Sequence, residues 1–258
     1  MIQPSIIDLE HMAREAGEIL RASYGTNIEI RNKGEIDLVT EADHRSESYL
    51  ISEIRRRFPE HRIFSEESGE LLGQDQHVWF IDPLDGTVNY AHHVPVFAVS
   101  IAYQQDGALW LGAVYDPMRD EMFSAQHGEG ARLNRKPIRI SSTSQLDRSL
   151  LATGFAYDIR KHPEKNLDHF ARFSVRCQGI RRFGSAAIDL CYVAAGRYDG
   201  FWELRLNDWD VAAGALIAEE AGAYITDIHG KPDYFAQPQS ILAANPTLHA
   251  QMLMVLQE

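Results

Sequence analysis

A short apolar strand that ends in two carboxylates constrains this chain more than any other feature. Residues 78–81 are β-branched or aromatic, and Pro83 follows them closely. Such a run predicts a short buried strand, and the proline is expected to stop its pairing. Asp82 and Asp85 then lie where the strand opens into a loop. We therefore expect a sheet with an acidic edge.

Gly86 and Thr87 come directly after these acids. Glycine lets the backbone approach a ligand closely, and the amides of both residues can point at an anion if a helical turn begins there. Two carboxylates alone would repel a phosphate group, so the pattern needs a divalent cation between them. The segment therefore predicts a metal-assisted phosphate site.

The composition is that of a globular chain with a sizeable core. It has 258 residues, of which 45% are hydrophobic and 24% charged, which excludes a disordered or fibrous protein. The net charge of -12 and a pI near 5.4 argue against direct nucleic-acid binding. The first ten residues do not form a signal peptide, and no apolar run approaches the roughly 20 residues of a membrane span. We expect a cytoplasmic chain, away from membranes.

The two cysteines, Cys177 and Cys191, belong to no Cys-x-x-Cys or Cys/His cluster. A disulfide framework would need more of them. We predict that both are thiols of the core.

The first half of the chain predicts two helices over a sheet. Apolar residues at helical spacing over 7–20 and 40–58 indicate the helices, and Ser5 with Asp8, like Thr40 with Asp43, has the spacing of a capping box. Strands are predicted at 62–65, 78–81, 97–104 and 109–115. Asp106-Gly107 between the last two indicates a hairpin and hence antiparallel pairing.

Beyond residue 142 the pattern changes to strands and helices in alternation. Strands are predicted at 150–153 and 179–183, and helices at 167–175, 185–195 and 208–221. Such alternation favours a mostly parallel sheet. We therefore expect an α+β domain over residues 1–142 and an α/β domain over residues 143–258.

Three further acidic segments are candidates for the same site, each with a structural alternative. Ser65-Glu66-Glu67-Ser68 follows a strand but is compatible with a solvated loop. Asp208-Trp209-Asp210 begins a helix that either acid could cap. The segment from Asp37 to Asp43 is an adequate capping box without any chemistry.

In combination these segments resemble the inositol monophosphatase family of magnesium-dependent sugar and inositol phosphatases. Its two signatures match residues 79–87 and 209–214, and three shorter elements match residues 37–43, 65–68 and 184–187, all in family order. Residues 181–187 and 192–197 are most similar to the bacterial SuhB-like branch. Ser65 stands where many members have glycine. The resemblance covers essentially the whole chain and implies a mixed α/β fold, a layered αβαβα sandwich with two sheets and flanking helices.

The resemblance also implies a ligand set for two or three Mg²⁺ ions, with Mn²⁺ as a substitute. Glu66, Asp82 and the main-chain carbonyl of Leu84 would hold a first ion, and Asp82 would be shared with a second ion that Asp85 and Asp210 complete. Hard oxygen donors suit Mg²⁺ independently of any resemblance. The resemblance further implies inhibition by millimolar lithium. The loop at Lys33-Gly34 is similar to loops of the family that fold over the active site and help hold a further ion.

The resemblance also implies which residues are catalytic and which bind the substrate. Thr87 and Asp43 resemble the pair that orients and deprotonates a metal-bound water, with Glu66 also in its shell. The wall of the substrate pocket is expected from the following residues: Gly86, Thr87, Arg181, Gly184, Ser185, Ala186, Glu203 and Asp210. The alternative to a substrate-binding role is, for Glu203, an exposed acid at the end of a strand. For Arg181 the alternative is a solvent-exposed pair with Arg182. His92-His93 are expected to be polar loop residues.

The resulting expectation is a phosphoric monoester hydrolase acting on inositol monophosphate or a related polyol phosphate. Fructose-1,6-bisphosphate, a nucleotide 3'-phosphate, NADP and histidinol phosphate are substrates of relatives with the same metal core. A homodimer is implied by the family. The resemblance to the SuhB-like branch implies a different class of function, that of a factor that binds the transcription machinery, with RNA polymerase as its partner. The acidic net charge is compatible with such a protein partner.

Overall fold

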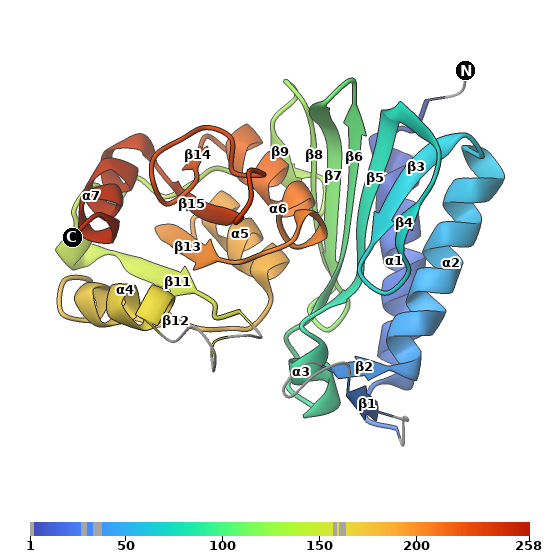
Figure 1. Cartoon of the computed structure of the whole chain (residues 1–258), viewed down its shortest axis with the longest axis horizontal. Coiled ribbons are helices and arrows are strands. Elements are labelled where there is room, and N and C mark those ends of the chain that lie inside the picture. Colours follow the sequence, from blue (N-terminus) through green and yellow to red (C-terminus); the bar gives the residue numbers. More distant parts are fainter. Residues whose placement is uncertain (1–2, 27–29, 33–37, 157–158, 160–163) are drawn as a thin grey trace.

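Five layers of secondary structure make up the computed structural model, which describes residues 3–26, 30–32, 38–156, 159 and 164–258 (Figure 1). Helices α1 (Ile6–Ser23) and α2 (Glu41–Arg57) cover the outer face of a large sheet. Helices α5 (Ala186–Ala194) and α6 (Asp208–Glu220) fill the space between that sheet and a smaller one, whose outer face carries α4 (Glu164–Ser174) and α7 (Pro246–Leu256). The expected αβαβα sandwich with mixed α/β character is confirmed. The loop at Lys33-Gly34 and Asp37 lie outside the described residues.

The larger sheet belongs to the first half of the chain. Its strand order is β10-β9-β8-β7-β6-β5-β3-β4, and every neighbouring pair is antiparallel except β3 with β5. The two residues between β6 and β7, Asp106 and Gly107, have φ angles of 50° and 82°, the left-handed values that a tight hairpin requires. The predicted hairpin is confirmed. The strands are β3 (His61–Ser65), β4 (Gly69–Leu71), β5 (Gln74–Asp85), β6 (Ala98–Gln105), β7 (Ala108–Asp116), β8 (Glu121–Gln126), β9 (Ala131–Leu133) and β10 (Lys136–Pro137).

Strand β5 is longer than predicted, because Pro83 does not end it. Asp82 pairs with Ser100 and Asp85 with Ala98 of β6, so that β5 holds one extra residue between the two pairs. Such a bulge leaves a residue unpaired, and a proline without an N–H is tolerated there. The expected stop at Pro83 was wrong. Instead, both acids remain on the strand at its irregular end.

The smaller sheet has the order β12-β11-β13-β15-β14. Strand β11 is parallel to β12 and β13, whereas β15 runs antiparallel to β13 and β14. The prediction of a mostly parallel sheet was therefore wrong, because β14 and β15 are joined by a loop and not by a crossover helix, so the chain reverses direction. The strands are β11 (Leu150–Thr153), β12 (Gly179–Arg181), β13 (Gly200–Leu204), β14 (Tyr224–Thr226) and β15 (Ser240–Ala244), and a 3-10 turn, η1 (Leu146–Arg148), precedes them.

Both predicted capping boxes are present. The backbone N–H of Thr40 donates to Asp43 Oδ2 at 2.9 Å, and the Asp43 N–H donates to Thr40 Oγ1 at 3.4 Å. Ser5 and Asp8 make the same reciprocal pair at the start of α1. A small ribbon of β1 (Ile30–Asn32) and β2 (Leu38–Thr40) leads into α2, so Thr40 is both the last residue of β2 and the N-cap of the helix.

The two halves of the chain share one core. Buried side chains of the large sheet, such as Phe80 and Val114, belong to the same apolar cluster as Leu190 of α5 and Leu216 of α6. The chain passes from the larger sheet to the smaller one between Pro137 and Leu150, around the predicted boundary at 142. The division into two domains stays a prediction.

The cysteines differ in their surroundings. Both are free thiols, and Cys191 is buried, as predicted. Cys177 is only half-buried, because it follows the end of α4 at the edge of the smaller sheet. The prediction of a core thiol was thus right for Cys191 alone.

No helix in the described part of the chain is long and apolar enough to cross a membrane.

Candidate active site

A cavity between the two sheets brings together segments that are far apart in the sequence. The ends of β3 and β5 form one side, and the starts of α5 and α6 with the end of β13 form the other. Most of the predicted site residues are on its wall. The lining residues are Glu66, Asp82, Leu84, Asp85, Gly86, Thr87, Gly154, Phe155, Ala156, Arg182, Gly184, Ser185, Ala186, Asp189, Glu203, Arg205, Leu206, Asn207 and Asp210.

Gly86 makes the turn from β5 into the short helix α3 (Thr87–Ala91). Its φ of 98° is left-handed, and an added Cβ would lie 3.0 Å from the Val96 carbonyl oxygen. A larger residue would therefore be both strained and crowded. The expected close approach of this backbone to a ligand stays a prediction. Helix α3 begins at Thr87, directly after Gly86, and no side chain caps its N-terminus among the described residues.

Thr87 and Asp43 are in contact although they come from different segments. The Thr87 hydroxyl lies 3.1 Å from Asp43 Oδ1 and 3.0 Å from the Leu84 carbonyl oxygen, so its single proton can go to either acceptor. Asp43 is fully buried, and burial raises the pKa of its carboxyl against the lowering effect of hydrogen bonds from Thr40 and Thr87. The other carboxylate oxygen, Oδ2, caps α2. One carboxylate thus serves both the helix and Thr87.

Asp85 ties the two halves of the chain together at the site. Its Oδ2 accepts hydrogen bonds from the Ser185 hydroxyl at 2.6 Å and from the Ala187 N–H at 2.8 Å. Burial raises the pKa of Asp85 to about 6, and these hydrogen bonds oppose the rise. The first turn of α5 therefore fixes the orientation of Asp85, and Ser185, predicted as a substrate contact, is engaged with this carboxylate.

Asp82 lies on the cavity wall among other carboxyl groups. It is almost fully buried, and burial raises its pKa well above the usual range, assisted by Glu66, Asp85 and Asp210. A side-chain hydrogen bond joins Asp82 to Glu66. Two carboxyl groups can share such a bond only if one of them holds a proton.

Asp210 completes this acidic group from the other half of the chain. It is the third residue of α6, where its Oδ2 accepts a hydrogen bond from the Asn207 N–H at 2.7 Å. The sequence left helix capping and site chemistry as alternatives for this residue. The structure shows the cap, and it also places Asp210 on the cavity wall. Burial raises the pKa of its carboxyl well above the usual range. The hydrogen bond from Asn207 opposes the rise, and the charges of Asp85 and Glu66 add to it.

The donor set fits a hard divalent cation in its chemistry. As the side chains stand, no three or more His, Cys, Asp or Glu residues in the described ranges are arranged to hold an ion. Nevertheless, the carboxyls of Asp82, Asp85 and Asp210 repel one another, and all three have raised pKa values. Carboxylates that lie this close together on a cavity wall are costly unless a cation compensates their charge. A bound cation would compensate the negative charge of these carboxylates.

Glu203 forms the far wall of the cavity at the end of β13. Burial raises its pKa to about 8, with Arg182 acting in the opposite direction. An added Cβ on Gly154 would lie 2.1 Å from Glu203 Oε1, so a larger residue here would require the carboxyl to move. The alternative of an exposed acid at a strand end is thereby excluded, because Glu203 is only 8% exposed.

Arg182, and not Arg181, lines the cavity. Arg181 is an exposed residue at the end of β12, and its Nη1 donates to the Ile180 carbonyl oxygen. The prediction for Arg181 therefore needs correction. Neighbouring residues leave a strand on opposite sides, so a choice between two adjacent arginines depends on the orientation of the strand. Gly184, with φ of 80°, gives room to the Arg182 guanidinium, which lies 2.4 Å from where a Cβ would stand.

The sequence also gave no role to Asp189, although it lines the cavity. It is 1% exposed, and its Oδ1 has no hydrogen-bond partner among the residues that the structure describes. Burial raises the pKa of Asp189 well above the usual range, and the charges of Glu203 and Asp85 raise it further. The signal was present, because Asp189 is a single charged residue in a helix that is otherwise apolar, Ala186–Ala194.

The amino-acid sequence as a whole matches the model of the inositol monophosphatase family over residues 3–258. The chain belongs to this family. It is 42% identical over 255 residues to the Nus factor SuhB of Salmonella typhimurium, a match that covers 98% of this chain and 95% of that protein. It is 45% identical over 243 residues to the inositol-1-monophosphatase of Synechocystis sp., covering 93% and 84%.

The fold agrees with this membership. The crystal structure of the extragenic suppressor protein suhB from Bartonella henselae superposes with a TM-score of 0.93 at 39% identity and covers 98% of each chain. As a member of the inositol monophosphatase family, the chain is a phosphomonoesterase. Enzymes of this family generally depend on a metal ion.

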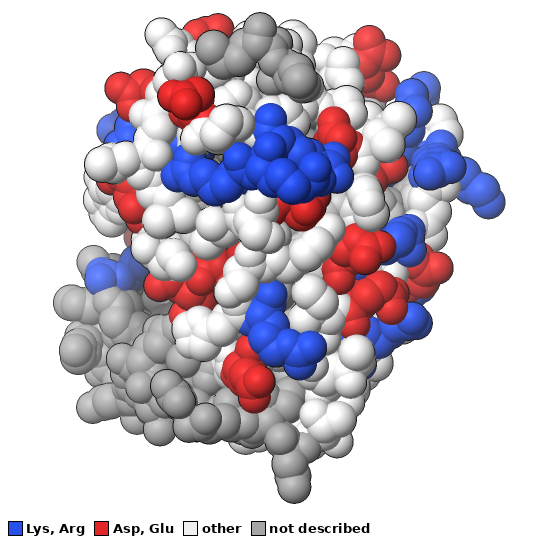
Figure 2. Space-filling view, turned by 90° about the vertical axis from the view of Figure 1, so that its right-hand side faces the viewer, with Lys and Arg blue, Asp and Glu red and all other residues white. Residues whose placement is uncertain are grey.

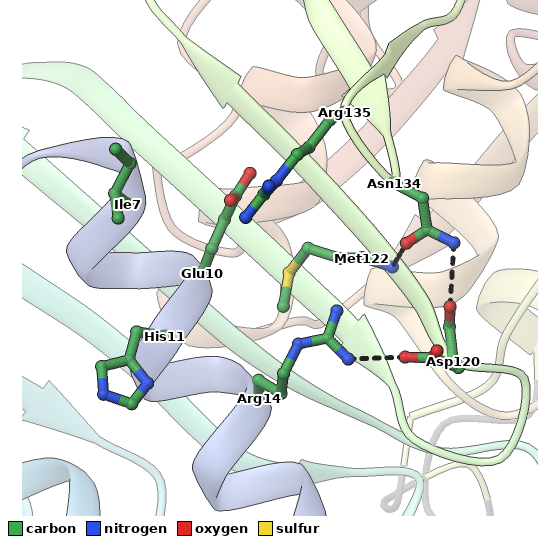
Figure 3. A pocket seen from close by; sticks show the side chains of 8 residues that line it. All are labelled: Ile7, Glu10, His11, Arg14, Asp120, Met122, Asn134 and Arg135. Atoms are coloured by element: carbon green, nitrogen blue, oxygen red, sulfur yellow. Dashed lines mark hydrogen bonds and ion pairs between the residues drawn. The ribbon is translucent and has the colours of Figure 1, made fainter.

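Two other features are set apart from this inositol monophosphatase site. His92 and His93 are exposed beyond α3, and neither lines the cavity. A second cavity, of about 400 Å³, lies between α1 and the strands β8 and β9 (Figure 3). On its wall, Arg14 forms an ion pair with Asp120 at 2.6 Å, and Glu10 accepts a hydrogen bond from the Ser124 hydroxyl at 2.7 Å.

Proposed function

We propose that this enzyme hydrolyses inositol monophosphate or a related sugar or polyol phosphate to the alcohol and inorganic phosphate, with Mg²⁺ as its cofactor. The observation that carries the proposal is the contact of the Thr87 hydroxyl with the buried Asp43 carboxylate, beside a wall of further carboxyls. A hydroxyl held in this way keeps its lone pairs available for a water molecule. A phosphate ester needs such a water together with compensation of its charge.

Five residues would hold the metal: Glu66, Asp82, Asp85 and Asp210 through their carboxylates, and Leu84 through its main-chain carbonyl. A bound Mg²⁺ supplies a water of lowered pKa and positive charge beside the phosphate. The number of ions, two or three, and substitution by Mn²⁺ are part of the proposal. Millimolar lithium is expected to inhibit by competing for the same carboxylates.

Thr87 and Asp43 orient the attacking water. The Thr87 Oγ1 accepts a hydrogen bond from the water while its own proton goes to Asp43 Oδ1. As the water attacks, its proton passes to Thr87, and the Thr87 proton passes to Asp43. The raised pKa of Asp43, caused mainly by burial, favours this uptake. Glu66 is the alternative base.

The remaining residues bind the two ends of the ester. The amides of Gly86 and Thr87 would bind phosphate oxygens, because a helical turn begins there. The alcohol would face Gly184, Ala186 and Glu203 on the opposite wall, together with Asp210. Ser185 acts through Asp85, to which it donates at 2.6 Å.

A panel of phosphate esters, each assayed with Mg²⁺ and again after chelation, tests the proposal. We expect the highest kcat/KM for inositol 1-phosphate or another polyol monophosphate. Higher values for fructose-1,6-bisphosphate, a nucleotide 3'-phosphate, NADP or histidinol phosphate would redirect the substrate within the family. Turnover that survives complete chelation would overturn the metal-dependent mechanism.

A second candidate function is suggested by the relatives' names. The Salmonella relative is named a Nus factor, and the match covers nearly all of both chains. A protein partner such as RNA polymerase would suit the charge better than nucleic acid would, since the net charge is -12. On the face shown in Figure 2, a short row of basic side chains is bordered by acidic ones. Co-purification with RNA polymerase from cells would support this role, and its absence at native expression level would refute it.

A homodimer and a cytoplasmic location are the remaining parts of the proposal. Light scattering coupled to size exclusion measures the first directly. A mass near 29.2 kDa would show a monomer and contradict the expected dimer.

A further inference from the structure

Glu47 is a buried carboxylate that the catalytic scheme above does not use. It lies on α2, one helical turn after Asp43, and is 4% exposed. Its Oε1 accepts hydrogen bonds from the Ser65 hydroxyl and, at 2.9 Å, from the Ser68 N–H. Its Oε2 accepts from the Ser68 hydroxyl at 2.8 Å. Both oxygens of Glu47 are thus engaged with the segment that contains Glu66.

That segment is a tight hairpin loop. Ser65 of β3 pairs with Gly69 of β4, which leaves Glu66, Glu67 and Ser68 as the loop. Gly69 has a φ of 67°, the left-handed conformation typical of a three-residue hairpin loop. Glu47 therefore holds the residue before the loop and the last residue within it. Between them, the Glu66 N–H donates to the Ile81 carbonyl oxygen of β5 at 3.3 Å.

The same face of α2 reaches the other segments of the site. Asp43 contacts Thr87, and the Ser46 hydroxyl donates to the Pro83 carbonyl oxygen at 2.8 Å. Positions i, i+3 and i+4 of a helix lie on one face, so Asp43, Ser46 and Glu47 form a continuous row. One turn of α2 thereby sets the spacing of the loop with Glu66, the bulge of β5 and Thr87.

We infer that Glu47 is a positioning residue that fixes Glu66 for metal binding by clamping Ser65 and Ser68. The inference rests on the proposed function, because it assigns Glu66 to the metal. The clamp is stronger in this chain than a glycine at position 65 would allow, because Ser65 supplies one of the three donors. A buried carboxylate that lacks its donors is costly, so the loop and Glu47 hold each other in place.

Four variants test the clamp: Glu47→Ala, Glu47→Gln, Ser65→Gly and, as a control, Glu53→Gln. Glu53 is on the same helix but pairs with Arg56 and Arg57 at the surface. The readouts are hydrogen exchange of the Ser68 amide, calorimetric Mg²⁺ binding without substrate, the melting temperature, and kcat as a function of Mg²⁺ concentration.

We expect Glu47→Ala to accelerate Ser68 exchange at least about tenfold and to weaken Mg²⁺ binding by about ten- to a hundredfold, the effect of losing charged hydrogen bonds. Glu47→Gln should fall between Glu47→Ala and the wild type, because its amide keeps one acceptor oxygen. Ser65→Gly should weaken Mg²⁺ binding by about three- to tenfold, the effect of losing one hydrogen bond. Glu53→Gln should match the wild type in all of these measurements.

Wild-type Mg²⁺ affinity in folded Glu47→Ala would overturn the inference, and so would a lower melting temperature with unchanged affinity, which is the result of a merely structural role. If Glu47→Ala does not fold, Glu47→Gln and Ser65→Gly decide by the same criteria. If the wild-type protein itself binds no Mg²⁺, the proposed function fails, and the role of Glu47 fails with it. Normal wild-type binding with unaffected variants would remove Glu47 alone.

Discussion

The Thr87 hydroxyl donates to Asp43 Oδ1 at 3.1 Å while Asp43 Oδ2 accepts the capping N–H of Thr40 at 2.9 Å. The cap and the contact with Thr87 do not compete, because they use different oxygens of the carboxylate. Helix α2 thereby holds the group that we propose as the proton acceptor. In the proposed mechanism, the position of Thr87 relative to this helix would set where the attacking water lies.

Thr87→Ala should lower kcat by about 10²- to 10⁴-fold, the usual contribution of positioned proton transfer. Metal affinity should change little, because the hydroxyl is not among the proposed ligands. Thr87→Ser keeps the hydroxyl and should retain most of the activity. Steady-state kinetics and Mg²⁺ titration of both variants provide the measurement. Near-normal kcat in Thr87→Ala would leave Glu66 as the base.

Asp82→Asn should lose more activity than Asp85→Asn or Asp210→Asn, because Asp82 is expected to contact both ions. The fold should persist, since burial raises the pKa of Asp82 and the metal-free protein favours its neutral form. Kinetics at saturating Mg²⁺ and thermal denaturation without metal separate the two effects. An Asp82→Asn enzyme with most of its Mg²⁺-dependent turnover would remove Asp82 from the site.

Glu203→Gln should raise KM for a polyol phosphate and leave a small aryl phosphate nearly unaffected. The loss of one charged hydrogen bond to a substrate hydroxyl is worth roughly 1 to 3 kcal/mol, and the aryl ester offers no such hydroxyl. Kinetics on matched pairs of esters measure the difference. Equal losses on both substrates would indicate a metal-binding or structural role for Glu203.

The metal-free protein should lose stability as the pH rises from about 5 to about 8. Burial raises the pKa of Glu203 from 4.5 to about 8, so the folded state keeps a proton that the unfolded chain releases above pH 4.5. The stabilising difference is full below pH 4.5 and is lost as the pH rises through the folded pKa. Each tenfold difference in proton affinity is worth about 1.4 kcal/mol.

Glu203→Gln provides the matched control, because it removes this titration. In metal-free protein its melting temperature should exceed that of the wild type at pH 8 and approach it at pH 4.5. Thermal denaturation across this range with a chelator measures the effect. A wild-type melting temperature that falls no faster with pH than that of Glu203→Gln would contradict the assignment of the raised pKa to this residue.

Local features of the fold were predictable from the sequence. The capping pairs Ser5 with Asp8 and Thr40 with Asp43, and the hairpin at Asp106-Gly107, depend on residues within three positions of one another. Hydrogen bonds and φ preferences over such short separations are encoded directly in the residue types. The acidic segments could be recognised as parts of one site for the same reason, because their motifs are local and their order matches the family.

Tertiary structure decided which of these groups meet. Thr87 contacts Asp43 across 44 residues, and Ser185 contacts Asp85 across 100, because helices α2 and α5 pack on opposite faces of the sheet that carries β5. The choice of Arg182 over Arg181 depended on the orientation of β12. Packing in the folded chain gave the Glu47 carboxylate its hydrogen-bond donors, and it left Asp189 Oδ1 without a donor among the described residues. Periodicity says which face of an element is apolar, but the contacts of a buried polar group depend on what packs against that face.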